Sequence, residues 1–186
     1  MSQKGGNWAP CFPGCPVLMY RKIVIPLLLV SVLACLLFPL HVLQVKAVRN
    51  GDVVFLCRVR PGVKLSLGYI HSVEHCPVWD HIKIDEQFHM VLHETVFSSS
   101  NTGLPAVLSM GERFSAEGGQ FRISNMRRVL PAVTLWVDDK YENTLILGEE
   151  KILKLPSLAG NTLLEILIEK MTLIEFIYHK AKTMVD

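Results

Sequence analysis

Apolar and polar residues alternate along most of this chain in short runs that turn-forming residues separate. Successive side chains of a strand point to opposite faces, so a period of two predicts strands. Turn signals such as Asn50-Gly51-Asp52 and Arg60-Pro61-Gly62 recur at short intervals. The expected strands are 53–59, 63–73, 78–84, 89–97, 120–124, 132–137, 144–147 and 151–155. This pattern, without long helical periods, predicts an all-β fold, a small antiparallel sandwich or barrel-like domain.

One segment near the N-terminus departs from this alternation. The run from Ile23 to Leu40 is apolar and contains no charged residue. As a helix it would extend about 27 Å, close to the thickness of the hydrocarbon core of a bilayer. Arg21 and Lys22 precede it, so the positive-inside rule places the N-terminus in the cytoplasm and the rest of the chain outside. We favour an uncleaved transmembrane anchor; the alternatives are a cleaved signal peptide and a lipoprotein signal ending at Cys35.

The sequence therefore predicts three parts. Residues 1–22 form a flexible cytoplasmic tail, because Gly and Pro residues are frequent in them. Residues 23–40 form the transmembrane helix or signal segment, and residues 41–186 form an exoplasmic β domain. Each interpretation of the apolar segment places this domain on the outer face of the cytoplasmic membrane. The lipid bilayer is the first expected partner.

The C-terminal run from Leu163 to Val185 is ambiguous in its period. Its apolar residues fit a helix passably, but they also occupy both faces of a strand, as in a buried strand. We interpret it as a final strand or strand pair followed by a short polar tail. A second membrane crossing is disfavoured because Glu165, Glu169 and Glu175 interrupt the run.

The charge balance argues against one class of partner. Of the 19 Lys and Arg residues, three precede the apolar segment, whereas all 17 Asp and Glu residues follow it. The part beyond the apolar segment is therefore nearly neutral. A nucleic-acid-binding domain needs a clustered basic face, so nucleic acid is not an expected partner.

Most of the polar chemistry lies in the run from Tyr69 to Asp80. If the chain reverses at His75-Cys76, an antiparallel register pairs Val73 with Val78 and places His71 beside Asp80 on the core face. A buried carboxylate needs a partner, and an imidazole can supply a charge-assisted hydrogen bond. We favour a structural role for this pair over a functional dyad. A single bent strand is the alternative, and it would separate the two residues.

Other groupings of reactive residues are weaker. Five histidines lie between positions 71 and 93, but strand parity does not make them converge on one metal ion, so neither a metal site nor a cofactor is expected. Ser72 follows His71 directly, and neighbouring strand residues face opposite sides, which disfavours a hydrolase. Cys57 and Cys76 are expected to be free thiols rather than a disulfide.

The polar loop 98–105 is the remaining candidate, since loops on a rigid scaffold often bind ligands. If it folds over the hairpin, it could frame a small polar pocket there. The candidate ligand-binding residues are His71, Ser72, Glu74, Asp80 and Gly103.

The same run resembles the signature of the bacterial domain-of-unknown-function family 1850. The residues that carry the resemblance are Tyr69, His71-Ser72-Val73-Glu74, Pro77-Val78, Asp80 and Gly103-Leu104-Pro105. It covers about residues 40 to 175. Two positions depart from the family pattern: Asp80 stands where Glu is expected, and Asn101-Thr102 stand where Gly-Ala is more usual.

The resemblance implies a partner rather than a reaction. Such small membrane-anchored domains are typically encoded beside the fused membrane subunit of TAXI-type TRAP transporters, which import solutes without ATP. We therefore expect a non-catalytic, extracytoplasmic accessory protein of a TRAP solute transporter. The alternative is a small-ligand or metal-binding β module on the outer face of the membrane.

Overall fold

The computed structural model describes residues 16–98, 108–149 and 151–185 of the chain. The chain divides into two compact units, Met1–Phe38 and Pro39–Asp186. The first unit contains a single described helix, α1 (Pro16–Leu36). Large apolar side chains from Ile23 to Leu37 of this unit are mostly exposed. Among the described residues, no helix combines the length and the apolar composition that a membrane crossing requires.

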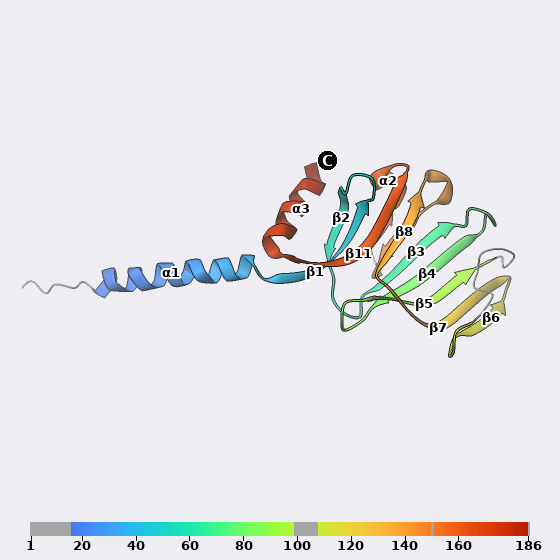
Figure 1. The fold of residues 1–186 in the computed structure, drawn as a ribbon, viewed down its shortest axis with the longest axis horizontal. Coiled ribbons are helices and arrows are strands. Elements are labelled where there is room, and N and C mark those ends of the chain that lie inside the picture. Colours follow the sequence, from blue (N-terminus) through green and yellow to red (C-terminus); the bar gives the residue numbers. More distant parts are fainter. Residues whose placement is uncertain (1–15, 99–107, 150, 186) are drawn as a thin grey trace, which may run out of the picture. The chain divides into compact units, whose positions relative to one another are not determined.

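The second unit consists mainly of antiparallel strands, which confirms the predicted all-β class (Figure 1). Its strands form a four-stranded sheet in the order β2-β1-β11-β8 and a seven-stranded sheet in the order β10-β9-β3-β4-β5-β7-β6. The strands are β1 (Pro39–Ala47), β2 (Val53–Arg58), β3 (Lys64–Ile70), β4 (Pro77–Ile84), β5 (Met90–Phe97), β6 (Arg113–Glu117), β7 (Gln120–Leu130), β8 (Ala132–Val137), β9 (Thr144–Leu147), β10 (Lys151–Lys154) and β11 (Thr162–Thr172). Short helices η1 (Asp139–Tyr141) and α2 (Leu155–Ala159) connect strands, and α3 (Leu173–Val185) ends the chain.

The two sheets share one hydrophobic core. A single cluster of buried side chains includes Leu43 and Val45 of β1, Leu65 of β3, Ile84 of β4 and Leu164 of β11. Leu43 and Leu164 come from the four-stranded sheet, and Leu65 and Ile84 from the seven-stranded sheet. The sheets therefore bury their apolar faces against each other, as the layers of a sandwich do.

Strand β1 begins within the apolar segment, so the β unit starts at Pro39 rather than at the expected residue 41. β1 lies between β2 and β11 and pairs with β11 along its whole length, from Pro39↔Thr172 to Ala47↔Leu164. Leu40 and Val42 are buried. β1 was not among the predicted strands, because its apolar start, Pro39 and Leu40, continues the apolar run and hides the boundary.

The predicted final strand is confirmed in the C-terminal segment, but a helix stands where a short polar tail was expected. β11 is followed by an amphipathic helix, α3, whose Leu173 and Phe176 pack against a buried cluster containing Leu56 of β2. The helix begins with reciprocal bonds between Thr172 and Glu175: the Thr172 backbone N–H donates to Oε2 of Glu175, and the Glu175 N–H donates to Oγ1 of Thr172. This is a capping box, a Thr followed three residues later by Glu, and its sequence signature identifies the helix start.

Candidate functional site

A pocket of about 530 Å³ opens within the β unit between strands β3 and β4 of one sheet and β8 of the other. We call it the β3–β8 pocket. Its lining residues are Leu67, Tyr69, Ile70, His71, Ser72, Asp80, Val133, Thr134, Leu135, Trp136, Tyr141 and Asn143. Most of these side chains are apolar or aromatic, and a few polar groups lie among them. That composition and size are typical of small-molecule sites.

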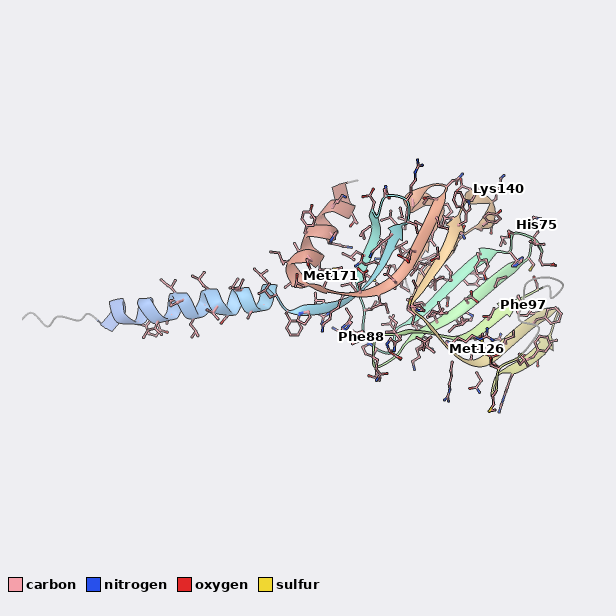
Figure 2. The ribbon with its side chains drawn as sticks, viewed as in Figure 1. His75, Phe88, Phe97, Met126, Lys140 and Met171 are labelled. Carbon is pink, nitrogen blue, oxygen red and sulfur yellow. The ribbon has the colours of Figure 1, made fainter. Side chains whose placement is uncertain are left out.

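The hairpin that carries the pocket has a different register from the predicted one. β3 ends at Ile70 and β4 begins at Pro77, so a six-residue loop replaces the expected turn at His75-Cys76. Asp80 lies opposite Leu67, not opposite His71, and the expected His71–Asp80 strand pair is therefore wrong. Figure 2 shows His75 at this loop end of the hairpin and Phe88 near the other end.

The imidazole of His71 stabilises the six-residue loop 71–76 that connects β3 and β4. Its Nδ1 accepts hydrogen bonds from the backbone N–H groups of Val73 (3.4 Å) and Glu74 (3.2 Å). The backbone N–H of His75 donates to the carbonyl of His71, and His75 adopts a left-handed conformation with φ of 51°. Because Nδ1 accepts, the neutral ring carries its proton on Nε2, which is a donor. His71 thus caps a turn on the rim of the pocket.

Asp80 holds the central position on β4, between β3 and β5. Its Oδ1 accepts a hydrogen bond from Oγ1 of Thr95 at 2.7 Å, and its Oδ2 accepts one from the Tyr69 hydroxyl at 3.4 Å. Burial raises the pKa of Asp80 above the ordinary value of 3.8, and the two hydrogen bonds oppose this shift. Burial, together with the neighbouring Asp80 charge, also raises the pKa of the Tyr69 hydroxyl, which stays protonated.

The opposite wall comes from β8 and the turn after it. Asn143 is 2% exposed, and its side chain connects this turn to the strand. Its Oδ1 accepts from the Asp138 backbone N–H at 3.2 Å, and its Nδ2 donates to the Trp136 carbonyl at 3.4 Å. These bonds hold η1, and with it Tyr141, beside the strand. This wall was not predicted from the sequence, where its local signal is a pair of aromatic residues flanking the polar turn Asp138-Asp139.

The predicted site residues have separate outcomes. His71, Ser72 and Asp80 line the same pocket, whereas Glu74 does not, although its backbone N–H bonds to His71. No hydrogen bond joins Ser72 to His71 among the described residues. Gly103 and most of the loop 98–105 lie outside the described residues.

Among the other histidines, His81 makes local contacts. His81 Nδ1 bonds to the Ser66 hydroxyl at 2.8 Å, and His81 Nε2 lies 3.8 Å from Glu94 Oε1. Within 16–98, 108–149 and 151–185, no group of three or more His, Cys, Asp and Glu residues is arranged to hold a metal ion. Cys57 and Cys76 are free thiols, as expected.

The fold and the pocket define a class of protein. It is a two-sheet antiparallel β domain with a pocket of small-molecule size between β3 and β4 of one sheet and β8, the edge strand of the other. The family model "Domain of unknown function (DUF1850)" matches residues 65–153, just under half of the chain. This match covers the β3–β4 hairpin and β8, the two walls of the pocket, and it supports the family resemblance. Comparison with curated proteins and with solved structures gave no significant match.

Proposed function

We propose that the β unit is a non-catalytic module that binds a small organic molecule in the β3–β8 pocket. The observation that carries this proposal is the pocket itself. It has about 530 Å³ of volume, and apolar and aromatic side chains surround a small set of polar groups from both sheets. Pockets between 300 and 1,000 Å³ bury most of a drug-sized ligand.

The non-catalytic part of the proposal is supported by the bonding of His71 and Ser72. A nucleophile needs a general base within hydrogen-bonding distance, and the base needs a free ring nitrogen. His71 uses Nδ1 to cap its own turn and does not bond to Ser72. Both residues then serve binding: Ser72 supplies a hydroxyl and His71 supplies the donor Nε2–H.

A fragment-binding experiment tests this function. Purified full-length protein is screened by ligand-observed NMR against small organic fragments, and each hit is repeated with Tyr141→Ala, Trp136→Ala and the control Ile152→Ala. Ile152 is 63% exposed and lies outside the pocket lining. Hits that weaken in the two pocket variants and persist in the control support the proposal. An absence of hits, or hits that all three variants bind equally well, would refute it.

Attachment to the cytoplasmic membrane, with the β unit on the outer face, is the second part of the proposal. It is supported by the uncharged apolar run 23–40, preceded by Arg21 and Lys22, and by the exposed apolar side chains of α1. Membranes washed with alkaline carbonate should retain the protein, and protease added outside spheroplasts should degrade the β unit. Release of the protein by carbonate, or protection of the β unit, would contradict this arrangement.

The proposed partner is the membrane subunit of a TAXI-type TRAP transporter. Only the family resemblance supports it, and no feature of the pocket distinguishes this partner from others. Co-purification of a TRAP membrane subunit with the tagged protein is the expected result. Normal solute uptake after deletion of the gene would count heavily against an accessory role.

A further inference from the structure

The chemistry of the β3–β8 pocket limits the charge of its occupant. Asp80 is the only Asp, Glu, Lys or Arg residue in the described lining of the pocket. No Lys or Arg is present in the lining, and no ion pair joins Asp80 to a basic residue among the described residues. The walls that surround it come from β3, β4, β8 and η1, all within the second unit.

A half-buried carboxylate without a basic partner is an unusual arrangement. Removing a carboxylate from water is costly, so buried carboxylates in proteins are generally paired with a cation or held protonated. The hydrogen bonds from Thr95 and Tyr69 satisfy one acceptor site on each oxygen of Asp80, but neither donor is charged. A carboxylate can accept more bonds than these two. The pocket side of Asp80 therefore has acceptor capacity and a negative charge that no described Lys or Arg side chain pairs with. His81, on the same strand, has a favourable electrostatic effect on Asp80, but no ion pair joins the two.

The other lining residues suit the same kind of ligand. Tyr69 and Tyr141 are aromatic residues of the lining, and Tyr141 comes from the wall opposite Asp80. Trp136 lies in the same wall and is 53% exposed. Aromatic faces attract cations through the ring quadrupole, and ammonium and guanidinium groups favour such surroundings. Leu67, Ile70, Val133 and Leu135 provide apolar surface for a hydrocarbon body.

We infer that the β3–β8 pocket takes a small organic cation, with an ammonium or guanidinium group that pairs with the Asp80 carboxylate and an apolar body that packs against Tyr141, Val133 and Leu135. This inference rests on the proposed ligand-binding function and specifies the charge of the ligand. An anionic ligand would meet the Asp80 carboxylate without a compensating cation. A neutral ligand would leave the charge unpaired or require Asp80 to keep its proton.

Matched sets of fragments test the charge directly. In each set the same body carries an ammonium, a hydroxyl or a carboxylate: phenethylammonium, 2-phenylethanol and 3-phenylpropanoate form one set, and cyclohexylmethylammonium, cyclohexylmethanol and cyclohexylacetate form another. Dissociation constants for purified full-length protein are measured by NMR titration. We expect the ammonium member of each set to bind most tightly.

Two variants assign the effect to Asp80. Asp80→Asn keeps the size of the side chain and removes its charge, so it should weaken ammonium binding about 30-fold or more, as loss of one partner of a desolvated charge pair does. Asp52→Asn removes one carboxylate from the exposed turn before β2, outside the pocket lining, and should leave binding unchanged. In the wild-type protein, the side-chain carboxyl resonance of Asp80 should shift toward its ionised form when the ammonium binds.

Each outcome has a separate meaning. Tighter ammonium binding that Asp80→Asn abolishes establishes the inference. Equal or tighter binding of the alcohol or carboxylate, still weakened by Tyr141→Ala, would overturn the cationic ligand and leave the ligand-binding function intact. If no member of either set binds and the wider fragment screen also fails, both the inference and the proposed function are wrong.

Discussion

The indole ring of Trp79 lies directly over Gly68, its cross-strand neighbour in the β3–β4 hairpin. A Cβ atom added to Gly68 would lie 2.6 Å from the Trp79 ring, closer than real Cβ contacts come. Gly68 is buried beneath the ring, so the large residue covers the strand where the small one leaves space. Such pairing of an aromatic residue with a strand glycine restores packing that the glycine alone lacks.

Gly68→Ala should destabilise the protein by about 1–3 kcal/mol, because the new methyl group forces the ring or the strand to move. Urea denaturation of the full-length protein measures this change. The same substitution in a Trp79→Val background should cost less, since the smaller side chain leaves room for the methyl group. An equal cost in both backgrounds would show that the ring is not the cause.

A substitution at Leu43 tests whether the stability of the two-sheet fold depends on the shared core. It is fully buried in β1, within the cluster that joins both sheets. Leu43→Ala removes buried apolar surface and leaves a cavity, so a loss of about 2–5 kcal/mol in the free energy of unfolding is expected. The matched control Ile152→Ala changes an exposed side chain and should stay within about 0.5 kcal/mol of the wild type. A loss at Leu43 no larger than at Ile152 would contradict the shared core.

Asp80 should make the stability of the protein depend on pH in a defined direction. Burial is the main reason why the pKa of Asp80 is higher in the folded state than the unfolded value of 3.8. The contribution of Asp80 to the free energy of unfolding is therefore fully present below pH 3.8 and is lost as the pH rises through the raised pKa. Asn at this position cannot ionise. Asp80→Asn should therefore become more stable relative to wild type as pH rises through this window.

Urea midpoints measured at several pH values between about 3.5 and 7 give this difference. The titratable groups near Asp80 are Tyr69 on β3, His71 in the next loop, His81 on β4 and Tyr141 on η1, and both proteins carry all of them. Asp52→Asn controls for the loss of one carboxylate. A constant difference between Asp80→Asn and wild type would show that the carboxyl titrates alike in the folded and unfolded states.

A further prediction concerns the ion pair between Arg128 and Glu112, at the edge of the seven-stranded sheet. Arg128 donates from Nε and Nη2 to the two carboxylate oxygens of Glu112, at 2.9 Å each. These bonds lower the pKa of Glu112 below its ordinary value of 4.5, and the Ser109 backbone N–H adds to the shift. Lys cannot donate in this two-pronged geometry, so Arg128→Lys should raise the pKa of Glu112 toward 4.5.

An NMR titration of the glutamate carboxyl carbons measures this pKa. Arg127→Lys is the matched control, because Arg127 is the sequence neighbour and makes no bond to Glu112 among the described contacts. The paired Glu112 should stabilise the fold above pH 4.5, and this contribution should disappear as pH falls through the lowered pKa. A Glu112 pKa that Arg128→Lys leaves unchanged would assign the shift to the backbone donor.

The strands could be predicted where alternation and turn residues coincide, and their faces followed from parity. The inner face was predicted correctly for Asp80, but its cross-strand partner is Leu67 rather than His71. The observed register differs from the predicted one by four residues, and an even shift leaves every side chain on the same face. Periodicity alone cannot select between such registers. The observed register goes with a six-residue loop in which the His71 ring accepts hydrogen bonds from two backbone N–H groups.

Half of the candidate site could not be predicted from local sequence at all. The wall formed by Trp136, Tyr141 and Asn143 is more than 50 residues from Asp80 along the chain, and the pairing of β8 with β11 places it there. β1 was missed for a different reason: its first two residues, Pro39 and Leu40, belong to the apolar run that contains α1, so the start of the strand is hidden.

The position of β1 determines the order in which the protein can be completed during synthesis. Of the described strands, β1 is the first to leave the ribosome and β11 the last, yet they pair along nine residues from Pro39↔Thr172 to Ala47↔Leu164. Until residues 162–172 have emerged, the growing chain has an unpaired strand edge on β1 next to its most apolar segment, a surface that invites pairing with other chains. A nascent chain stalled before β11 therefore exposes this edge, and the edge closes only when β11 has emerged.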